Sequence, residues 1–192
     1  MTTTAVSTPT TIAIPGYVPG RWTIDPVHSD VSFTARHMMV SKVRGHFRDF
    51  EGELITADDP RDSEVTATIK VQSVDTNSEY RDNHVRSGDF FDAETYPVAT
   101  YTSKGLTLDG DDFVLDGALT LRGVTKQVPL KVEVNGFGPD VQGGTRAGFT
   151  ARGKINRRDF GVNFGGLTNG VVAVGDTIEL ALEIEAVLQP AA

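Results

Sequence analysis

The chain has 192 residues, 26 acidic against 18 basic side chains, a formal net charge of −8 and no cysteine. This length fits one domain. The acidic balance, with no Lys/Arg-rich segment, excludes the basic footprint that nucleic-acid binding requires. Without cysteine there is no disulfide, no thiolate nucleophile and no Cys-based metal site.

The N-terminal residues 1–19 are rich in Thr, Pro and Ser, and we expect a flexible arm with a short edge strand at 11–14. They have neither the basic n-region nor the apolar h-region of a secretory signal, and no run of about 18 apolar residues follows. The expected location is the cytoplasm. From Trp22 onward apolar and polar residues alternate, so we expect residues 20–192 to form a single domain.

Alternation with a period of two is typical of strands with one dry and one wet face. Val31, Phe33 and Ala35 share one parity, and His37 continues it, so we expect its ring to point into the interior. One-sided alternation along most of the chain predicts an antiparallel sheet closed around an apolar interior. The predicted strands are residues 21–24, 30–39, 47–56, 64–73, 98–106, 112–121, 125–137, 145–156 and 177–188.

One stretch, residues 77–97, departs from this alternation. Asn77 can cap a helix that runs over residues 78–86 and stops at Gly88. A second helical turn around residues 92–95 would end before Pro97. We therefore expect a short helical insert that covers one open end of the barrel.

Characteristic segments occur in a consistent order over residues 22–188. They are Trp22-Thr-Ile-Asp25 followed by His28-Ser29; Phe33 and His37; Ser41-Lys-Val-Arg-Gly45-His-Phe47; Arg81-Asp82-Asn-His84; Asp89-Phe-Phe-Asp92 with Tyr96-Pro97; Gly117-Ala-Leu-Thr-Leu-Arg-Gly123; and Arg158-Asp-Phe-Gly161. As an ordered set they resemble the YceI-like family of lipocalin-like, polyisoprenoid-binding proteins.

The resemblance implies an all-β fold, an extended eight-stranded antiparallel lipocalin-like barrel with a tunnel for a long isoprenoid chain. It also implies a non-catalytic protein that sequesters or transports an isoprenoid quinone or a polyprenyl phosphate. A homodimer and transient membrane contact are further expectations, and the bound lipid takes the place of a cofactor. Many relatives carry a periplasmic signal, which this chain lacks as given. A stress-response scaffold that holds lipid structurally is another interpretation.

Phenylalanine provides wide apolar lining without unmet hydrogen bonds. The leading candidates for the tunnel wall are Phe33, Phe47, Phe50 and Phe149. The alternative interpretation is that each simply fills a core, as buried apolar side chains usually do.

Polar candidates for a head-group site lie on the second predicted strand and on the insert. His37 can bond a head group or belong to a buried polar pair, and His28 is expected at a turn or at the tunnel mouth. A phosphate or quinone oxygen can bind at Arg81 and Asp82, with His84 and Arg86 nearby. A guanidinium group can donate two hydrogen bonds to such oxygens at once. Alternatively, Arg81 and Asp82 form an ion pair that fixes the insert to the barrel. Arg122 and Arg158 allow the same two interpretations.

Metal binding and catalysis find little support in the residue spacing. No His pair has the i, i+2 spacing of a strand metal site, and we predict no metal. Asp25, His28 and Ser29 would point apart on a strand, so a triad does not follow from them. The Gly-rich residues 161–166 lack the Lys of a phosphate loop. We therefore predict no catalytic residue; the alternative function is a small-molecule enzyme that uses His37 and an interior Arg.

Overall fold

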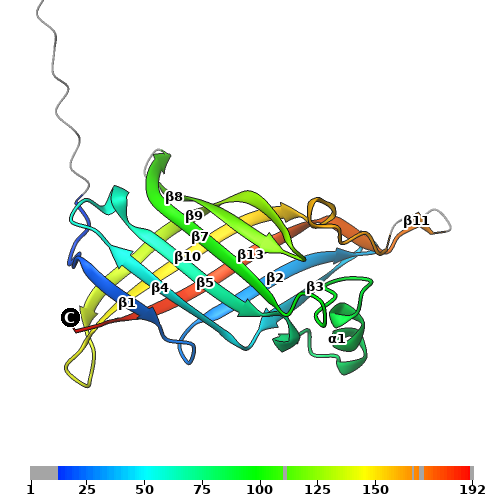
Figure 1. Cartoon of the computed structure of the whole chain (residues 1–192), viewed down its shortest axis with the longest axis horizontal. Coiled ribbons are helices and arrows are strands. Elements are labelled where there is room, and N and C mark those ends of the chain that lie inside the picture. Colours follow the sequence, from blue (N-terminus) through cyan, green and yellow to red (C-terminus); the bar gives the residue numbers. More distant parts are fainter. Residues whose placement is uncertain (1–12, 110–111, 166, 169–170, 191–192) are drawn as a thin grey trace, which may run out of the picture.

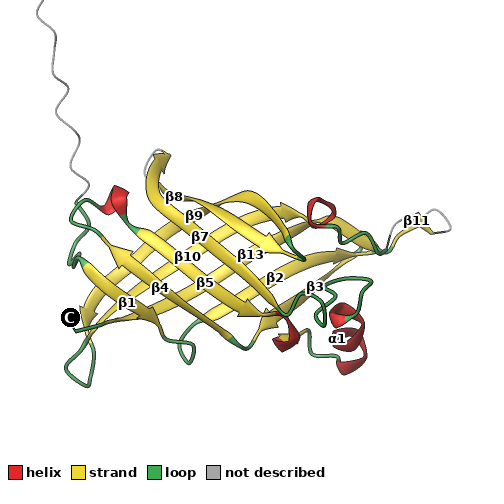
Figure 2. Ribbon diagram, in the orientation of Figure 1, coloured by secondary structure: helices red, strands yellow, loops and turns green. Residues whose placement is uncertain are grey.

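A computed structural model describes residues 13–109, 112–165, 167–168 and 171–190, and nearly all of its regular structure is β-strand (Figures 1 and 2). Within that part of the chain, no helix is both long and apolar enough to cross a membrane. The strands are β1 (Gly20–Ile24), β2 (Asp30–His37), β3 (Ser41–Phe47), β4 (Phe50–Thr56), β5 (Glu64–Lys70), β6 (Val74–Asp75), β7 (Val98–Asp109), β8 (Asp112–Leu121), β9 (Val124–Pro139), β10 (Thr145–Asn156), β11 (Leu167–Thr168), β12 (Val171–Val172) and β13 (Val174–Leu188).

The sheet closes through its last strand. Its order is β1-β4-β5-β7-β8-β9-β10-β13, and β13 pairs back with β1, which gives a ring of eight antiparallel strands. The 15-residue β13 pairs with β1 near its C-terminal end (Ile24↔Ala186) and with β2 along the rest (Glu183↔Asp30 to Val174↔His37). The eight-stranded barrel predicted from the family resemblance is confirmed.

Three positions in the barrel are each occupied by two shorter strands placed end to end: β1 with β2, β4 with β3, and β5 with β6. β1 and β2 both lie along β13, and β4 and β3 lie along β1 and β2 in turn. β6 then pairs with the end of β3, while β5 pairs with β4. β3 was not predicted from the sequence: one strand was expected over residues 47–56, whereas Arg48 and Asp49 separate β3 from β4.

The two ends of the barrel carry different structures (Figure 1). The α1 end holds helix α1 (Glu79–Arg86), the 3-10 helix η3 (Arg157–Phe160) and the β11–β12 hairpin. The Tyr17 end holds residues 13–19, the 3-10 helix η1 (Pro60–Asp62) and the C-terminus. A further 3-10 turn, η2 (Val71–Ser73), separates β5 from β6.

Residues 1–12 of the predicted flexible arm, with part of its predicted edge strand, lie outside the described residues. Residues 13–19 form no strand, but they pack on the barrel. The Tyr17 hydroxyl donates to the Ala57 carbonyl at 2.8 Å, and the Thr56 hydroxyl donates to the Val18 carbonyl at 2.8 Å. The arm is therefore attached to the barrel from about Tyr17 onward.

The helical insert begins one residue later than predicted. Ser78, not Asn77, is the N-cap residue, and Asn77 has a left-handed backbone with φ of 61°. The helix ends at Arg86, before Gly88, as the sequence predicts. Around the predicted second helical turn, the backbone N–H groups of Thr95 and Tyr96 both donate to the Asp92 carbonyl, which makes a turn but no helix.

Glycines on the inner wall allow large rings to lie flat against the sheet. Gly117 on β8 faces the ring of Tyr101 on β7, and an added Cβ would lie 2.1 Å from Tyr101 Cζ. Gly45 on β3 likewise lies under Phe33, with 2.4 Å from the added Cβ to Phe33 Cζ. Tyr101 is held there by hydrogen bonds from its hydroxyl to the Leu115 and Val128 carbonyls, at 3.3 and 3.1 Å. Burial raises its pKa to about 12.

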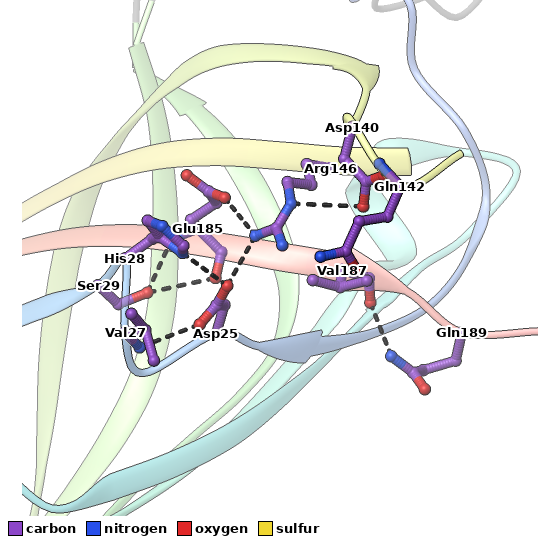
Figure 3. A network of polar contacts seen from close by, with 10 residues as sticks. All are labelled: Asp25, Val27, His28, Ser29, Asp140, Gln142, Arg146, Glu185, Val187 and Gln189. Atoms are coloured by element: carbon purple, nitrogen blue, oxygen red, sulfur yellow. Dashed lines mark hydrogen bonds and ion pairs between the residues drawn. The ribbon is translucent and has the colours of Figure 1, made fainter. Parts of the chain in front are cut away.

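A polar network fixes the bend between β1 and β2 (Figure 3). The Ser29 hydroxyl donates to the Glu185 carbonyl and accepts from the Glu185 N–H, which continues the β13 ladder where the backbone turns. Arg146 on β10 donates to Asp25 at 2.7 Å and also contacts Glu185 and Asp140. The Arg146 guanidinium, followed by His28, lowers the pKa of Asp25. Arg146 thus joins β10, β13, the β1–β2 bend and the β9–β10 turn.

We expect Gly117→Ala to destabilise the barrel, because the new methyl group displaces Tyr101 from the wall and breaks its two hydrogen bonds. Leaving such buried groups unpaired costs about 1–3 kcal/mol. Urea unfolding measures the loss. In a double-mutant cycle with Tyr101→Leu, the two changes should be non-additive, because the smaller side chain relieves the clash. Additive effects would show that the ring and the glycine are independent.

We expect Arg146→Met to lower the urea midpoint at pH 7 more than at pH 3. The folded-state pKa of Asp25 is depressed, so its stabilisation is present above its ordinary pKa and is lost as the pH falls through the folded value. The control is Arg21→Met, which removes an exposed ion pair with Glu53 and should change little. An equal deficit at both pH values would contradict the role assigned to the Arg146–Asp25 pair.

Candidate functional site

An apolar cavity of about 480 Å³ lies inside the barrel. Its volume falls within the roughly 300–1,000 Å³ of typical ligand pockets. Residues from both ends line it, from Tyr17 at one end to Arg81 and His84 at the other. The wall between the ends consists mainly of inward-facing aliphatic residues, among them Val65, Ile69, Leu115, Leu130, Val132, Ala151, Ile178, Leu180 and Leu182. The barrel is therefore hollow along its axis.

The four phenylalanines predicted to line a tunnel all border this cavity: Phe33, Phe47, Phe50 and Phe149. They also pack on one another and on neighbouring rings. The ring centroids of Phe33 and Phe47 are 5.6 Å apart, and those of Phe149 and Phe137 are 5.9 Å apart. The sequence allowed these phenylalanines either to fill a core or to line a cavity. In the structure the same side chains do both.

His37 borders the cavity but is exposed, at the last position of β2. The parity prediction gave the correct face of the strand. The expectation that the His37 ring points into an apolar interior was wrong, because β2 ends at His37 and the ring lies at the rim of the cavity. No described residue hydrogen-bonds this imidazole. Its two ring nitrogens are therefore available at the α1-end mouth.

Arg81 and Asp82 both hold Thr76, at the start of the insert. Arg81 Nε donates to the Thr76 hydroxyl and Nη2 to the Thr76 carbonyl, each at 2.7 Å. Asp82 is buried and accepts from the Thr76 backbone N–H at 2.8 Å and from its hydroxyl at 2.5 Å. Arg81 lines the cavity, whereas Asp82 is not among the lining residues. Asp82 thus fixes the insert, and Arg81 keeps Nη1 without a partner among the described residues.

His84 lies on α1 and also borders the cavity. Its Nε2 is 2.8 Å from an Asp89 carboxylate oxygen. The ring packs edge-on against Phe90 and Phe164, with centroids 5.2 and 4.7 Å away. The Asp89 contact and these rings hold the imidazole at the mouth of the cavity.

Arg157 is a cavity-lining residue that the sequence analysis missed. Only 3% of it is exposed. Its guanidinium donates to Asp176 and to four carbonyls, those of Val162, Phe164, Val174 and Gly175. Arg157 opens η3, where alternation stops, so no strand parity pointed to it. It organises the backbone that frames the α1-end mouth.

Arg122 and Arg158, given two interpretations from sequence, are both engaged with protein groups. Arg122 donates to the Gly88 and Phe90 carbonyls, and Arg158 donates to Asp176 at 2.7 Å. Neither is among the cavity-lining residues. Their observed contacts are structural.

The two ends of the cavity differ in charge. The α1 end presents Arg36, His37, Arg81 and His84 at the cavity surface. At the Tyr17 end the polar lining consists of Tyr17, Thr56, Ser63 and Glu64, and Asp58, Asp59 and Asp62 lie on the adjoining turn. At the Tyr17 end Asp59 is paired with Arg61 and Glu64 with Lys104, whereas the α1 end presents the guanidinium groups of Arg36 and Arg81, which attract an anionic group.

Asp25, His28 and Glu185 place one potential metal ligand each within 4.8 Å of one another. The Arg146 guanidinium already contacts both carboxylates, and a cation there would compete with it.

Residues 25–29 form a turn, so His28 does reach Asp25, at 2.8 Å, contrary to the strand-based expectation. The Ser29 hydroxyl bonds the Glu185 backbone instead of His28. This cluster is not part of the cavity lining.

Comparison with known proteins identifies the family. The YceI-like domain matches residues 22–186. Protein YceI of Escherichia coli O17:K52:H18 is 41% identical over 164 residues, 84% of this chain and 83% of that protein. The structure of Burkholderia cenocepacia BcnA has a TM-score of 0.74 at 25% identity and covers 84% of this chain and 98% of its own. A polyisoprenoid binding domain from Saccharophagus degradans shares the fold, with a TM-score of 0.70 at 19% identity over 88% of this chain and 98% of that domain. The family expected from the ordered motifs is thus confirmed: the chain belongs to the YceI-like family.

Proposed function

We propose that this protein binds one long isoprenoid lipid in its barrel and sequesters or carries it without chemical change. The observation that carries this proposal is the apolar cavity lined from both ends of the barrel. Its wall offers few polar groups between the ends, so it suits a hydrocarbon tail better than a polar metabolite.

The length of the wall supports a linear ligand. The 15 residues of β13 extend about 50 Å at roughly 3.3 Å per residue. With the usual barrel tilt of about 35–45°, the wall is roughly 35–40 Å tall. Burying apolar carbons yields about 0.8 kcal/mol each, so tail burial alone can supply strong binding with few head-group contacts.

The head group belongs at the α1 end in this proposal. Among the described residues that line this end, His37, Arg81 Nη1 and the Arg36 guanidinium have no hydrogen-bond partner, and Arg36 and Arg81 carry positive charge. Guanidinium and imidazolium both bond phosphate oxygens well. An isoprenoid quinone or a polyprenyl phosphate fits this arrangement. The shared fold of the Saccharophagus degradans polyisoprenoid binding domain supports the ligand class.

The direct test is organic extraction and native mass spectrometry of the purified protein, followed by loading with a long-chain quinone or a polyprenyl phosphate from detergent. We expect one lipid per chain. Failure to recover lipid and failure to load either compound would overturn the proposal.

We expect Ala151→Phe to reduce isoprenoid loading at least tenfold. Ala151 faces the cavity, so the added ring occupies space that the tail needs. Overpacking costs about 1–3 kcal/mol of stability, which a thermal melt will detect if the ring packs elsewhere. Ala181→Phe is the matched control, because Ala181 is exposed on the outer face of β13. Equal loading of both variants would show that the tail lies outside the cavity.

We expect His37→Ala with Arg81→Gln to weaken polyprenyl phosphate binding by about tenfold or more, in line with the ~1.5–3 kcal/mol of a hydrogen bond to a charged group. Loading of a neutral isoprenoid of equal length should change less than threefold. His28→Ala is the control, since His28 lies outside the cavity. The same loss for both lipids would assign these side chains to the fold instead of the head group.

A further inference from the structure

The tip of the β2–β3 hairpin is apolar and exposed. Met38 is 46% exposed, Met39 55% and Val40 84%. The tip adjoins the α1-end mouth, because His37 lines the cavity and the Met38 backbone N–H donates to the carbonyl of Ala173, another lining residue. The hairpin tip, defined as residues 38–40, is thus an apolar lip beside the opening.

The backbone of this tip is unfavourable for its residues. Met38 and Met39 have φ of 48° and 61°, and the Val40 N–H donates to the His37 carbonyl at 3.1 Å. The loop between the paired residues His37 and Ser41 is three residues long, and its first two residues are left-handed, a backbone conformation that Asn and Gly adopt most readily. Non-glycine residues in that region are strained, and such strain concentrates at functional positions. Turn geometry therefore does not explain two adjacent methionines here.

Cations flank the tip. Arg36 on β2 lies directly opposite Lys42 on β3, and Arg44 lies opposite Thr34. Like charges directly opposite on neighbouring strands are destabilising. Lys42 contacts Glu179 at 3.3 Å, but Arg36 and Arg44 have no ion pair with any described carboxylate. This local excess of positive charge stands out in a chain of net charge −8.

We propose that this hairpin docks the barrel on an anionic phospholipid bilayer, with Met38, Met39 and Val40 at the acyl boundary and Arg36, Lys42 and Arg44 against lipid phosphates. This inference rests on the proposed lipid-binding function and assigns the surface through which the cavity meets its lipid source. Methionine suits the role because its flexible, apolar side chain adapts to irregular surroundings. Basic residues beside an apolar tip are typical of interfacial binding to anionic lipid.

Two other occupants fit the surface less well. A stable protein interface needs about 1,000 Å² or more, and three side chains at a narrow tip offer far less. In a two-fold dimer the same patch would face itself, which brings the cations of one copy, Arg36, Lys42 and Arg44, close to those of the other. Charged residues also protect free strand edges, but that role does not require apolar residues at the turn.

The experiment is flotation of the full chain with vesicles of phosphatidylcholine containing about 30% phosphatidylglycerol, and with phosphatidylcholine alone. We expect binding to the anionic vesicles, and we expect it to weaken as salt screens the charges. The informative variant is Met38→Asn with Met39→Gly. It supplies the favoured turn residues, so thermal stability should rise or stay unchanged while vesicle binding falls at least tenfold. This opposite response separates docking from folding.

A second variant, Arg36→Gln with Lys42→Gln and Arg44→Gln, should weaken anionic vesicle binding by about fivefold per charge. Val141→Ser is the control, a fully exposed apolar residue on the β9–β10 turn at the Tyr17 end.

Equal binding to both vesicle types, or unchanged binding of the Met38→Asn/Met39→Gly variant, would overturn the docking proposal. A dimer in size-exclusion chromatography that this variant abolishes would assign the tip to a second copy and overturn it as well. Loading of isoprenoid from detergent tests the proposed function separately, because it requires no vesicle. A protein that loads from detergent but does not float keeps its lipid-binding function and loses this docking surface.

Discussion

The whole barrel depends on a single long strand that pairs with two successive strands on one side. β13 forms a ladder with β1 near its C-terminal end and with β2 along the rest of its length. The backbone between those partners must turn without leaving ladder groups unpaired, since unpaired buried groups are costly. The Ser29 hydroxyl accepts from the Glu185 N–H, while the Glu185 carbonyl accepts from the Asp25 N–H at 2.8 Å and from the Ser29 hydroxyl. Ring closure therefore extends along a wall much longer than any of the first six strands.

A long closed sheet does not by itself give a cavity, because an eight-stranded barrel is narrow enough for side chains to fill. Two of the inward rings lie along the wall, where glycines leave room for them. Tyr101 rests on Gly117 and Phe33 rests on Gly45. The cavity between the ends is bordered mainly by aliphatic and phenylalanine side chains. Glycines that hold Tyr101 and Phe33 against the wall thus contribute to the open volume.

Period-two alternation was enough to predict most strands, because every second residue of a strand in a closed barrel faces the apolar interior. It failed for β3, whose seven residues include Lys42, Arg44 and Gly45 and whose preceding turn has no glycine or asparagine. Cavity-lining positions were predictable where strand parity decides, as for the four phenylalanines. They were not predictable outside the regular strands: Asp82 binds Thr76, Arg157 binds Val162 and Asp176, and His37 lies at the rim because its strand ends there.

The charge difference between the two ends constrains how a lipid would enter. A phosphate that entered first would cross an apolar bore in which it finds no partner, and burying an unpaired charge is very costly. A tail that entered first would meet only apolar wall, while its head group would stay at the proposed site beside His37 and Arg81. With the proposed hairpin at the bilayer surface, the head group remains in a polar interfacial zone throughout the transfer. In that proposed arrangement the Tyr17 end, with Asp58, Asp59 and Asp62, would face away from the anionic surface, so one charge distribution would both place the head group and orient the barrel.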